Sequence, residues 1–193
     1  MIAKPKKSDI SVIADLHMLS LPNELLSKLG RKFLTEIYSV ALSDNDSYFI
    51  ASKTGRNIQG FIFLSKNSGR FYKRLVTRRF FKLAFIIFEE LIQDISLLGK
   101  LASTAKYLLF SNAESIPEIL VLSVHPNMQR SGIGSALLKT LEDKLADDGL
   151  SVYNVKTTSL NKKSNRFYTK NDFKVIKRFK IQQRGWVEYR KKI

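Results

Sequence analysis

The N-terminal part of the chain shows apolar residues at helical spacing. Residues 2 to 44 begin with a short strand candidate, and a first helix then opens near Ser8 and ends before Pro22. Apolar residues recur every three or four positions from Leu25 to Val40, which predicts a second helix. Gly30 lies inside this helix, where glycine is unfavourable, and a close contact with another helix would explain it.

The middle of the chain combines strand-like and helical patterns. Residues 47 to 65 contain two β-rich runs with the turn-like sequence KTGRN between them, which predicts a hairpin. Residues 70 to 115 have a helical period and are flanked by basic residues. We predict two helices in this insert, with a break near Leu98-Gly99.

The last part of the chain alternates between strands and helices. Residues 118 to 157 predict a strand, a loop, a helix that ends at Gly149, and a second strand. The first of these strands, Glu118 to Val124, is almost entirely apolar, as expected of a central strand that is covered on both faces. Residues 158 to 193 predict a short helix and two further strands with Gly185 in the turn.

The composition limits the class of protein. A chain of 193 residues with 44% hydrophobic and 26% charged residues is expected to form one globular domain, residues 1–193, which includes the helical insert at 70–115. The absence of cysteine excludes disulfides, a thiolate metal site and a cysteine nucleophile, and we expect no metal. The N-terminus lacks the apolar core of a signal peptide, and the run from Leu83 to Phe88 is far shorter than the ~20 residues of a spanning helix. These features predict a cytoplasmic protein without a transmembrane segment.

The charge of the chain indicates an anionic partner. The formal net charge is +16, which suits nucleic acid, anionic lipid headgroups or a phosphate-bearing small molecule. Between Lys156 and Ile193 there are 13 lysines and arginines against 2 acidic residues. A solvated basic surface without a partner would explain the same excess.

Two glycines lie one residue apart at the start of a predicted helix. Gly132 and Gly134 follow Gln129-Arg130-Ser131. A helix N-terminus offers unpaired N–H donors and the positive end of the dipole, and glycine lets a phosphate approach the backbone. A Walker loop is excluded because Ser135-Ala136 follow Gly134, and a dinucleotide fingerprint is excluded because the third glycine is absent. The alternative is that the two glycines only relieve crowding at the helix start.

These residues resemble a known family. The sequence from Gln129 to Gly134 resembles the Q/R-x-x-G-x-G/A signature of the GNAT N-acetyltransferases. The preceding EILVLSVHP is similar to the fourth strand of that family, and SLNKKSNRFYTKNDF is similar to the segment after its fifth strand. Asp172 stands where the family usually has glycine, which we expect to affect only the turn. The resemblance covers residues 118 to 173, and the insert at 70 to 115 lies outside the common core.

The resemblance implies an α/β (α+β) fold and a co-substrate. The fold is a mixed, mostly antiparallel sheet flanked by helices, with a helical insert between strands three and four. Acetyl-CoA would place its pyrophosphate on the loop amides and its pantetheine arm along strand four, where that strand splays away from strand five and leaves backbone groups unpaired. The residues expected to bind acetyl-CoA are Leu122, Ser123, Val124, Gln129, Arg130, Ser131, Gly132, Ile133, Gly134, Ser135 and Asn161.

The resemblance also implies two catalytic residues. Tyr168 matches the general acid of the family, and the alternative is a core aromatic residue beside Phe167. Glu118 opens strand four, in register with the general base of some members, and the alternative is a solvated glutamate. A carboxylate needs burial or a relaying water to act as a base for an amine. His17 lies where the first helices often form the acceptor wall, so it is a substrate-binding candidate, with a satisfied surface or half-buried histidine as the alternative.

The acceptor follows from charge rather than from a motif. We predict transfer of an acetyl group to a primary amine, with an amino sugar or another anionic small molecule favoured because a cationic enzyme repels cationic acceptors. Protein N-terminal or lysine acetylation is an alternative. A basic nucleic-acid-binding module with a degenerate core is an alternative of another class, but no nucleic-acid recognition motif is visible. The insert is suited to covering a substrate, contacting membrane lipid or forming a homodimer.

Overall fold

The computed structural model describes residues 1–193 except 56, 100, 102–115 and 182. The strands are β1 (Ile2–Ala3), β2 (Ser47–Thr54), β3 (Asn57–Ser65), β4 (Glu118–Val124), β5 (Val152–Thr158), β6 (Lys174–Ile181) and β7 (Arg184–Lys192). The α-helices are α1 (Ile10–Ser20), α2 (Leu25–Lys28), α3 (Gly30–Leu42), α4 (Ser68–Gln93), α6 (Ile133–Asp147) and α7 (Lys162–Lys170). Two 3₁₀ turns, η1 (Lys7–Asp9) and η2 (Pro126–Met128), complete the order.

One seven-stranded sheet organises the molecule, in the order β1-β2-β3-β4-β5-β7-β6. Every neighbouring pair is antiparallel except β4 and β5, which are parallel. The hairpin predicted at residues 47 to 65 is β2 and β3. The predicted mixed, mostly antiparallel sheet is confirmed.

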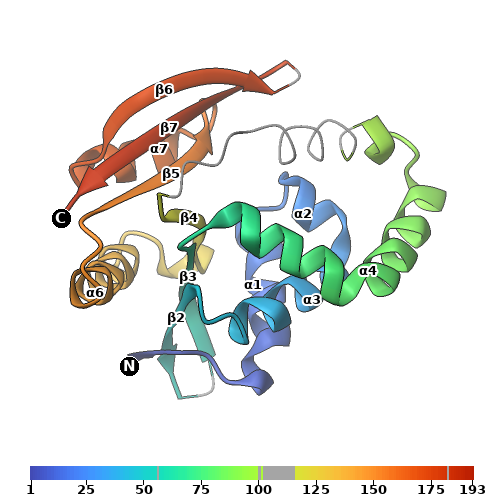
Figure 1. Cartoon of the computed structure of the whole chain (residues 1–193), viewed down its shortest axis with the longest axis horizontal. Helices are drawn as coiled ribbons and strands as arrows, with labels where there is room; N and C mark the ends of the chain where they lie inside the picture. The colour runs from blue at the N-terminus through green and yellow to red at the C-terminus, as the bar shows by residue number, and fades with distance from the viewer. Residues whose placement is uncertain (56, 100, 102–115, 182) are drawn as a thin grey trace.

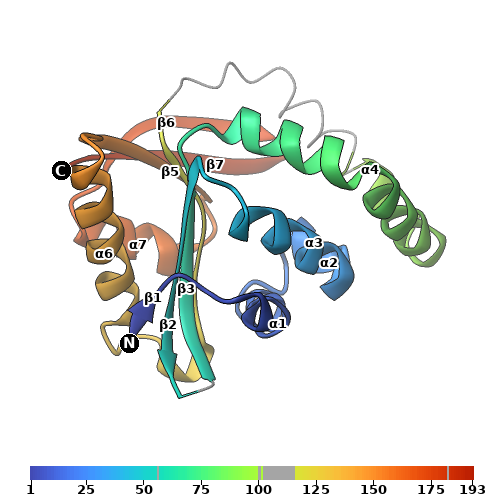
Figure 2. The same ribbon diagram turned by 60° about the horizontal axis from the view of Figure 1, so that its bottom comes forward.

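Helices cover both faces of the sheet, as Figures 1 and 2 show. Side chains alternate between the two faces of a strand, so neighbouring residues of β2 enter different cores. Phe49 packs with α1, α3 and α4, whereas Ile50 packs with the buried leucines of α6 and with α7. No described helix is long and apolar enough to cross a membrane.

The sheet divides between β4 and β5. These strands pair only at Glu118 with Asn154 and at Ile119 with Val155. Beyond this point β5 pairs with β7 over its whole length, from Val152 to Thr158. Figure 1 shows β5, β6 and β7 turning away from β2 and β3. The splay that the resemblance implied is therefore present, and it leaves the second half of β4 without a partner strand on one edge.

The first two helical predictions need correction. Ser8 lies in the turn η1 and does not cap the first helix, which begins at Ile10 after Asp9. The predicted second helix is two helices that divide at Gly30. Gly30 has φ +75°, and a Cβ there would lie 3.1 Å from Oε1 of Glu90 in α4. The close helix contact expected at this glycine is present, and the left-handed backbone adds a break that apolar spacing did not reveal.

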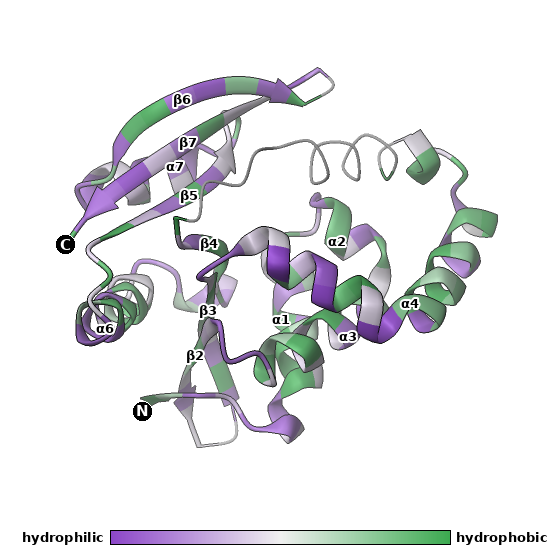
Figure 3. Ribbon diagram, in the orientation of Figure 1, coloured by the Kyte–Doolittle hydropathy of each residue, from purple (hydrophilic) through white to green (hydrophobic). Residues whose placement is uncertain are grey.

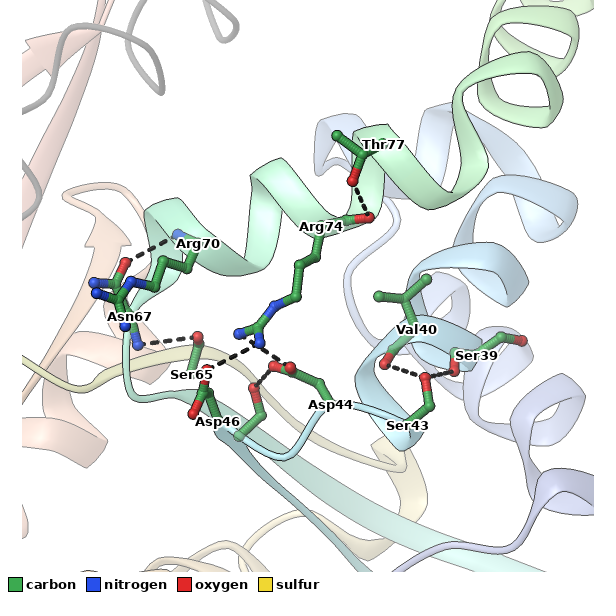
Figure 4. A network of polar contacts seen from close by, with 11 residues as sticks. Ser39, Val40, Ser43, Asp44, Asp46, Ser65, Asn67, Arg70, Arg74 and Thr77 are labelled. Carbon is green, nitrogen blue, oxygen red and sulfur yellow. Dashed lines mark hydrogen bonds and ion pairs between the residues drawn. The ribbon is translucent and has the colours of Figure 1, made fainter.

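The insert contains one long helix in the described residues. α4 ends at Gln93 because Asp94 is extended (φ −141°, ψ 91°), so the break predicted near Leu98-Gly99 comes about five residues earlier. The second predicted helix falls mainly on 102–115, outside the described residues. Hydrogen bonds and ion pairs fix the first turns of α4 (Figure 4): the Asn67 side chain accepts from the Arg70 N–H at 2.9 Å, and Arg74 pairs with two aspartates of the α3–β2 loop.

The outer face of α4 remains apolar. Its exposed large hydrophobic side chains are Val76, Phe80, Phe81 (85% exposed), Phe85, Phe88 and Ile92, and the last four follow one another at intervals of three or four residues. Figure 3 shows this part of α4 largely in the colour of hydrophobic residues. Membrane contact or dimer formation through the insert stays a prediction.

Candidate active site

The loop before α6 presents free backbone donors. Gly132 takes φ +86° and begins α6, and Arg130 takes φ 66°. Among the described residues, no hydrogen-bond acceptor is found for the N–H groups from Arg130 to Ser135. Arg130, Ser131, Gly132 and Ser135 are exposed, so a ligand can reach these donors. An anion placed there would gain several N–H bonds at the positive end of a helix of 15 residues.

The two glycines of this loop have different roles. Gly132 has open space around a hypothetical Cβ, so its positive φ is what requires glycine. At Gly134 a Cβ would lie 3.2 Å from Cε2 of Phe167 and 3.7 Å from Val124. The alternative role considered from the sequence, relief of crowding, therefore applies to Gly134, which lets α6 pack closely against α7.

Side chains fix the loop to its surroundings. Gln129 donates from Nε2 to the Val124 carbonyl at 3.4 Å and accepts from Lys163 of α7 at 3.5 Å. Ser131 donates to the Met128 carbonyl at 2.6 Å. Both side chains are already hydrogen-bonded within the protein. Ile133, the first residue of α6, is partly buried.

A cavity of about 1140 Å³ lies where β4 and β5 separate. Residues of the hydrophobic cores on both faces of the sheet line it, so the cavity extends through the gap between β4 and β5. Glu118, Tyr168, Asn161, Leu122 and His17 are all among its lining residues. The loop from Gln129 to Ser135 does not line it, and neither do Ser123 and Val124. The structure thus brings together both predicted catalytic residues and places the predicted anion-binding loop outside the cavity.

Tyr168 lies at the boundary between the α7 core and the cavity. It is 5% exposed, and its ring contacts Phe173 at a centroid distance of 5.2 Å and Tyr189 at 5.7 Å. Burial raises the pKa of the phenol, so the hydroxyl stays protonated and is able to donate a hydrogen bond at neutral pH. The two interpretations from the sequence are compatible, because the ring packs in the core while the side chain also borders the cavity.

Glu118 is buried beside a lysine. Burial raises the pKa of its carboxyl group, and Lys156, whose Nζ lies 3.1 Å from Oε2, opposes this shift. Glu188 of β7 lies 4.0 Å from the same Nζ. The alternative of a solvated glutamate is wrong. The sequence reasoning missed Lys156 and Glu188, which face each other in the β5–β7 register; the only sequence signal was a charged residue within each strand.

Two of the remaining predicted residues, Asn161 and Val124, form hydrogen bonds within the protein. Asn161 caps α7 by accepting from the Ser164 N–H at 3.1 Å, and it therefore orders this region. Val124 accepts at its carbonyl from Ser20 at 3.2 Å, and Ser123 is 3% exposed. His125 accepts from the Asn127 N–H at 3.3 Å and thereby caps the turn η2.

His17 is buried more deeply than expected. It is 2% exposed, and its Nδ1 lies 2.5 Å from the hydroxyl of Tyr38. Nε2 has no hydrogen-bond partner among the described residues. Burial lowers the pKa of His17 to about 4, so the imidazole is neutral at pH 7.

Acid is expected to destabilise the protein through His17. The folded state holds His17 neutral, whereas the unfolded chain protonates it near its ordinary pKa of 6.5. The contribution of neutral His17 to the free energy of unfolding is therefore fully present above pH 6.5 and decreases as pH falls toward 4, by about 2 kcal/mol at pH 5. Urea unfolding of the wild type, of His17→Asn and of His125→Asn at pH 7.5 and 5 measures the difference. If His17→Asn lost as much stability between pH 7.5 and pH 5 as the wild type does, the assignment of this loss to His17 would be wrong. The control, His125→Asn, should lose as much stability as the wild type.

The described residues contain no group of histidine, aspartate and glutamate side chains that could hold a metal ion.

The sequence matches the model of the acetyltransferase (GNAT) family over residues 12–173. A search of curated proteins found no match. Among solved structures, the chain is similar to the PaiA N-acetyltransferase from Thermoplasma acidophilum in complex with coenzyme A (TM-score 0.64, 16% identity, 100% of this chain and 98% of that one). It is also similar to a ribosomal-protein alanine N-acetyltransferase from Escherichia coli (TM-score 0.61, 12% identity, 100% and 93%). A third structure is an aminoglycoside 6'-acetyltransferase type Ii (TM-score 0.63, 14% identity, 100% and 96%).

At these identities the structural likeness shows the fold, and the names of the last two proteins indicate different acceptors on that fold. The family model spans the strand β4, the loop, α6, β5 and α7, which are the elements that carry the resemblance noted in the sequence. The chain therefore belongs to the acetyltransferase (GNAT) family, whose enzymes take the acetyl group from acetyl-CoA.

Proposed function

We propose that this enzyme is an N-acetyltransferase that moves the acetyl group of acetyl-CoA to a primary amine. The observation that carries the proposal is the cavity at the β4–β5 splay, which Glu118 and Tyr168 both line. One residue is a buried carboxylate with a raised pKa, and the other is a phenol that stays protonated. They supply a proton acceptor and a proton donor to the same cavity.

The loop and β4 offer a site for acetyl-CoA. The unpaired amides from Arg130 to Ser135 suit the pyrophosphate, and Lys163 adds positive charge beside Gln129. The amide-rich pantetheine arm would pass from there along β4, whose edge β5 leaves open after Ile119. In this placement the thioester enters the cavity near Leu122.

The reaction forms one bond and breaks one bond. The amine nitrogen attacks the thioester carbonyl, and a C–N bond forms while the C–S bond breaks. Glu118, directly or through one water, accepts the proton that leaves the nitrogen. Tyr168 stabilises the departing thiolate by hydrogen bonding, because burial makes complete transfer of the phenol proton unfavourable. The products are the N-acetylated amine and CoA.

A charge change in the loop should weaken acetyl-CoA binding without harming the fold. Ser135 is exposed in the first turn of α6, where a glutamate stabilises a helix. The same charge would repel the pyrophosphate, so Ser135→Glu should weaken CoA binding about tenfold or more in calorimetry. Ala146→Glu, in the last turn of the same helix, is the matched control and should bind as the wild type does. Equal affinities for all three proteins would exclude this loop as the pyrophosphate site.

The acceptor is proposed to be an anionic small molecule, of which an amino sugar bearing phosphate is one example. β6 carries exposed Lys174, Lys177, Arg178 and Lys180, and two other residues of that strand line the cavity. β6 is also the edge strand, and lysines at an edge prevent pairing with other chains, so this charge has a second explanation.

The salt dependence of kcat/KM distinguishes steering of an anionic acceptor from protection of the sheet edge. If the positive charge steers the acceptor, kcat/KM for an anionic amine should fall as salt rises, because the Debye length shrinks from ~10 Å at 0.1 M to ~3 Å at 1 M. An uncharged amine should show only the salt effect on acetyl-CoA. Preference for a cationic peptide, with activity increased by salt, would instead support a protein acceptor.

A further inference from the structure

The acceptor side of the cavity has mainly apolar walls. On one side, β6 and β7 contribute Phe179, Ile181 and Trp186; the rings of Phe179 and Trp186 stack at a centroid distance of 6.5 Å with an interplanar angle of 14°. The helical walls include Leu25 of α2, Phe33 and Ile37 of α3, and Leu75, Phe80 and Leu83 of α4. Aromatic rings therefore come from the strand side and from the helix side of the same space.

Four charged residues that line the cavity form two ion pairs. Glu118 pairs with Lys156 at 3.1 Å, and Arg184 lies 3.8 Å from Glu24. The Glu24–Arg184 pair joins the segment before α2 to the first residue of β7, and both residues are partly exposed. Polar side chains such as Lys28, Ser68 and Thr157 also border the cavity, but aromatic and aliphatic side chains form most of its walls. A polyhydroxylated body that lay against the apolar part of these walls would lose water without gaining matched partners there.

The volume also exceeds what a small amine needs. Binding sites of ~300–1,000 Å³ hold drug-sized ligands, and the described residues enclose about 1140 Å³. The pantetheine end and the acetyl group fill only the part near β4. The remaining space lies between α4 and the β6–β7 hairpin, where the walls are apolar.

We infer that the acceptor amine carries an apolar, ring-bearing body, which lies between α4 and the β6–β7 hairpin while its amino group faces Glu118. This inference rests on the proposed N-acetyltransferase activity and makes its acceptor class narrower. Among anionic acceptors, it favours an apolar amine with an acidic group over an amino sugar. Burial of a ring against such walls lowers the free energy of the bound acceptor in the transition state as well as in the ground state, so it raises kcat/KM.

A comparison of two amines tests the inference. With saturating acetyl-CoA, kcat/KM for 2-phenylethylamine should exceed that for glucosamine by about 10- to 100-fold, the factor expected for burying one phenyl ring. The reverse order, or acetylation of neither amine by a protein that binds CoA in calorimetry, would overturn the inference. Failure to bind CoA at all would instead remove the proposed function on which it rests.

Two neighbouring phenylalanines provide a matched pair of variants. Phe80 is 56% exposed and lines the cavity, whereas Phe81 is 85% exposed and does not line it. Phe80→Asp should lower kcat/KM for 2-phenylethylamine about tenfold relative to kcat/KM for glucosamine and leave CoA affinity unchanged. Phe81→Asp introduces the same charge on the same helix and should leave all three values unchanged. An equal effect of both variants on both amines would show that the wall beside Phe80 does not seat the acceptor.

Discussion

Tyr168→Phe is expected to lower kcat by about 10²- to 10⁴-fold, the usual contribution of a positioned proton donor. The substitution removes only a hydroxyl, and the ring can keep its contacts with Phe173 and Tyr189. The lost hydrogen bond strengthens as negative charge develops on the thiolate, so CoA affinity should remain within about twofold of the wild type.

The control for this experiment is Tyr189→Phe. Tyr189 is a neighbouring buried tyrosine whose hydroxyl donates to Asn165 at 2.7 Å, and it does not line the cavity. Its variant should lose some stability while retaining kcat. Turnover should be measured in a single-turnover experiment, so that product release does not hide the chemical step. An unchanged rate for Tyr168→Phe would leave Tyr168 with its core packing as its only role.

Glu118→Gln is expected to lower kcat/KM by about 10²- to 10⁴-fold at neutral pH and to remove the acid limb of the pH profile. Burial raises the pKa of the Glu118 carboxyl group above its ordinary 4.5. Below that raised pKa the carboxyl group is protonated and cannot accept a proton. The activity of the wild type should therefore rise with pH through the raised pKa, whereas the variant should lack this limb.

Glu188→Gln tests whether removal of any carboxylate near Lys156 lowers kcat/KM as Glu118→Gln does. Glu188 lies 4.0 Å from Nζ of Lys156 but does not line the cavity. The general-base assignment requires Glu188→Gln to keep most of the activity and to keep an acid limb, shifted to lower pH because Glu188 helps to raise the pKa of Glu118. If Glu118→Gln keeps the wild-type rate and profile, the base is another group or a water that Glu118 does not orient.

The sequence predicts those parts of the fold that depend on local signals. The apolar strand, the glycine-containing loop and the leucine-rich helix are neighbours in the chain, and they form β4, the loop and α6 as expected. The second helix divides at Gly30, where φ is positive and where Glu90, sixty residues away in another helix, lies 3.1 Å from a hypothetical Cβ. A pattern confined to residues 23–42 contains no information about that contact.

The candidate site also has features that local sequence predicts and features that depend on long-range contacts. Glu118 and Tyr168 could be proposed from motif positions, but whether they share one cavity depends on the separation of β4 from β5. The insertion of β7 between β5 and β6 places Glu188 opposite Lys156, and thereby sets the electrostatic environment of Glu118. Such long-range pairing follows from the whole sheet and not from any one strand.

The contact between Gly134 and Phe167 links the two halves of the proposed reaction site. A hypothetical Cβ at Gly134 would lie 3.2 Å from the Phe167 ring, and Phe167 precedes Tyr168 in α7. Even one added methyl group in the first turn of α6 would press on the helix that positions the phenol. Under the proposed mechanism, a substitution at Gly134 would therefore alter both the acetyl-CoA site and the position of the phenol that stabilises the thiolate.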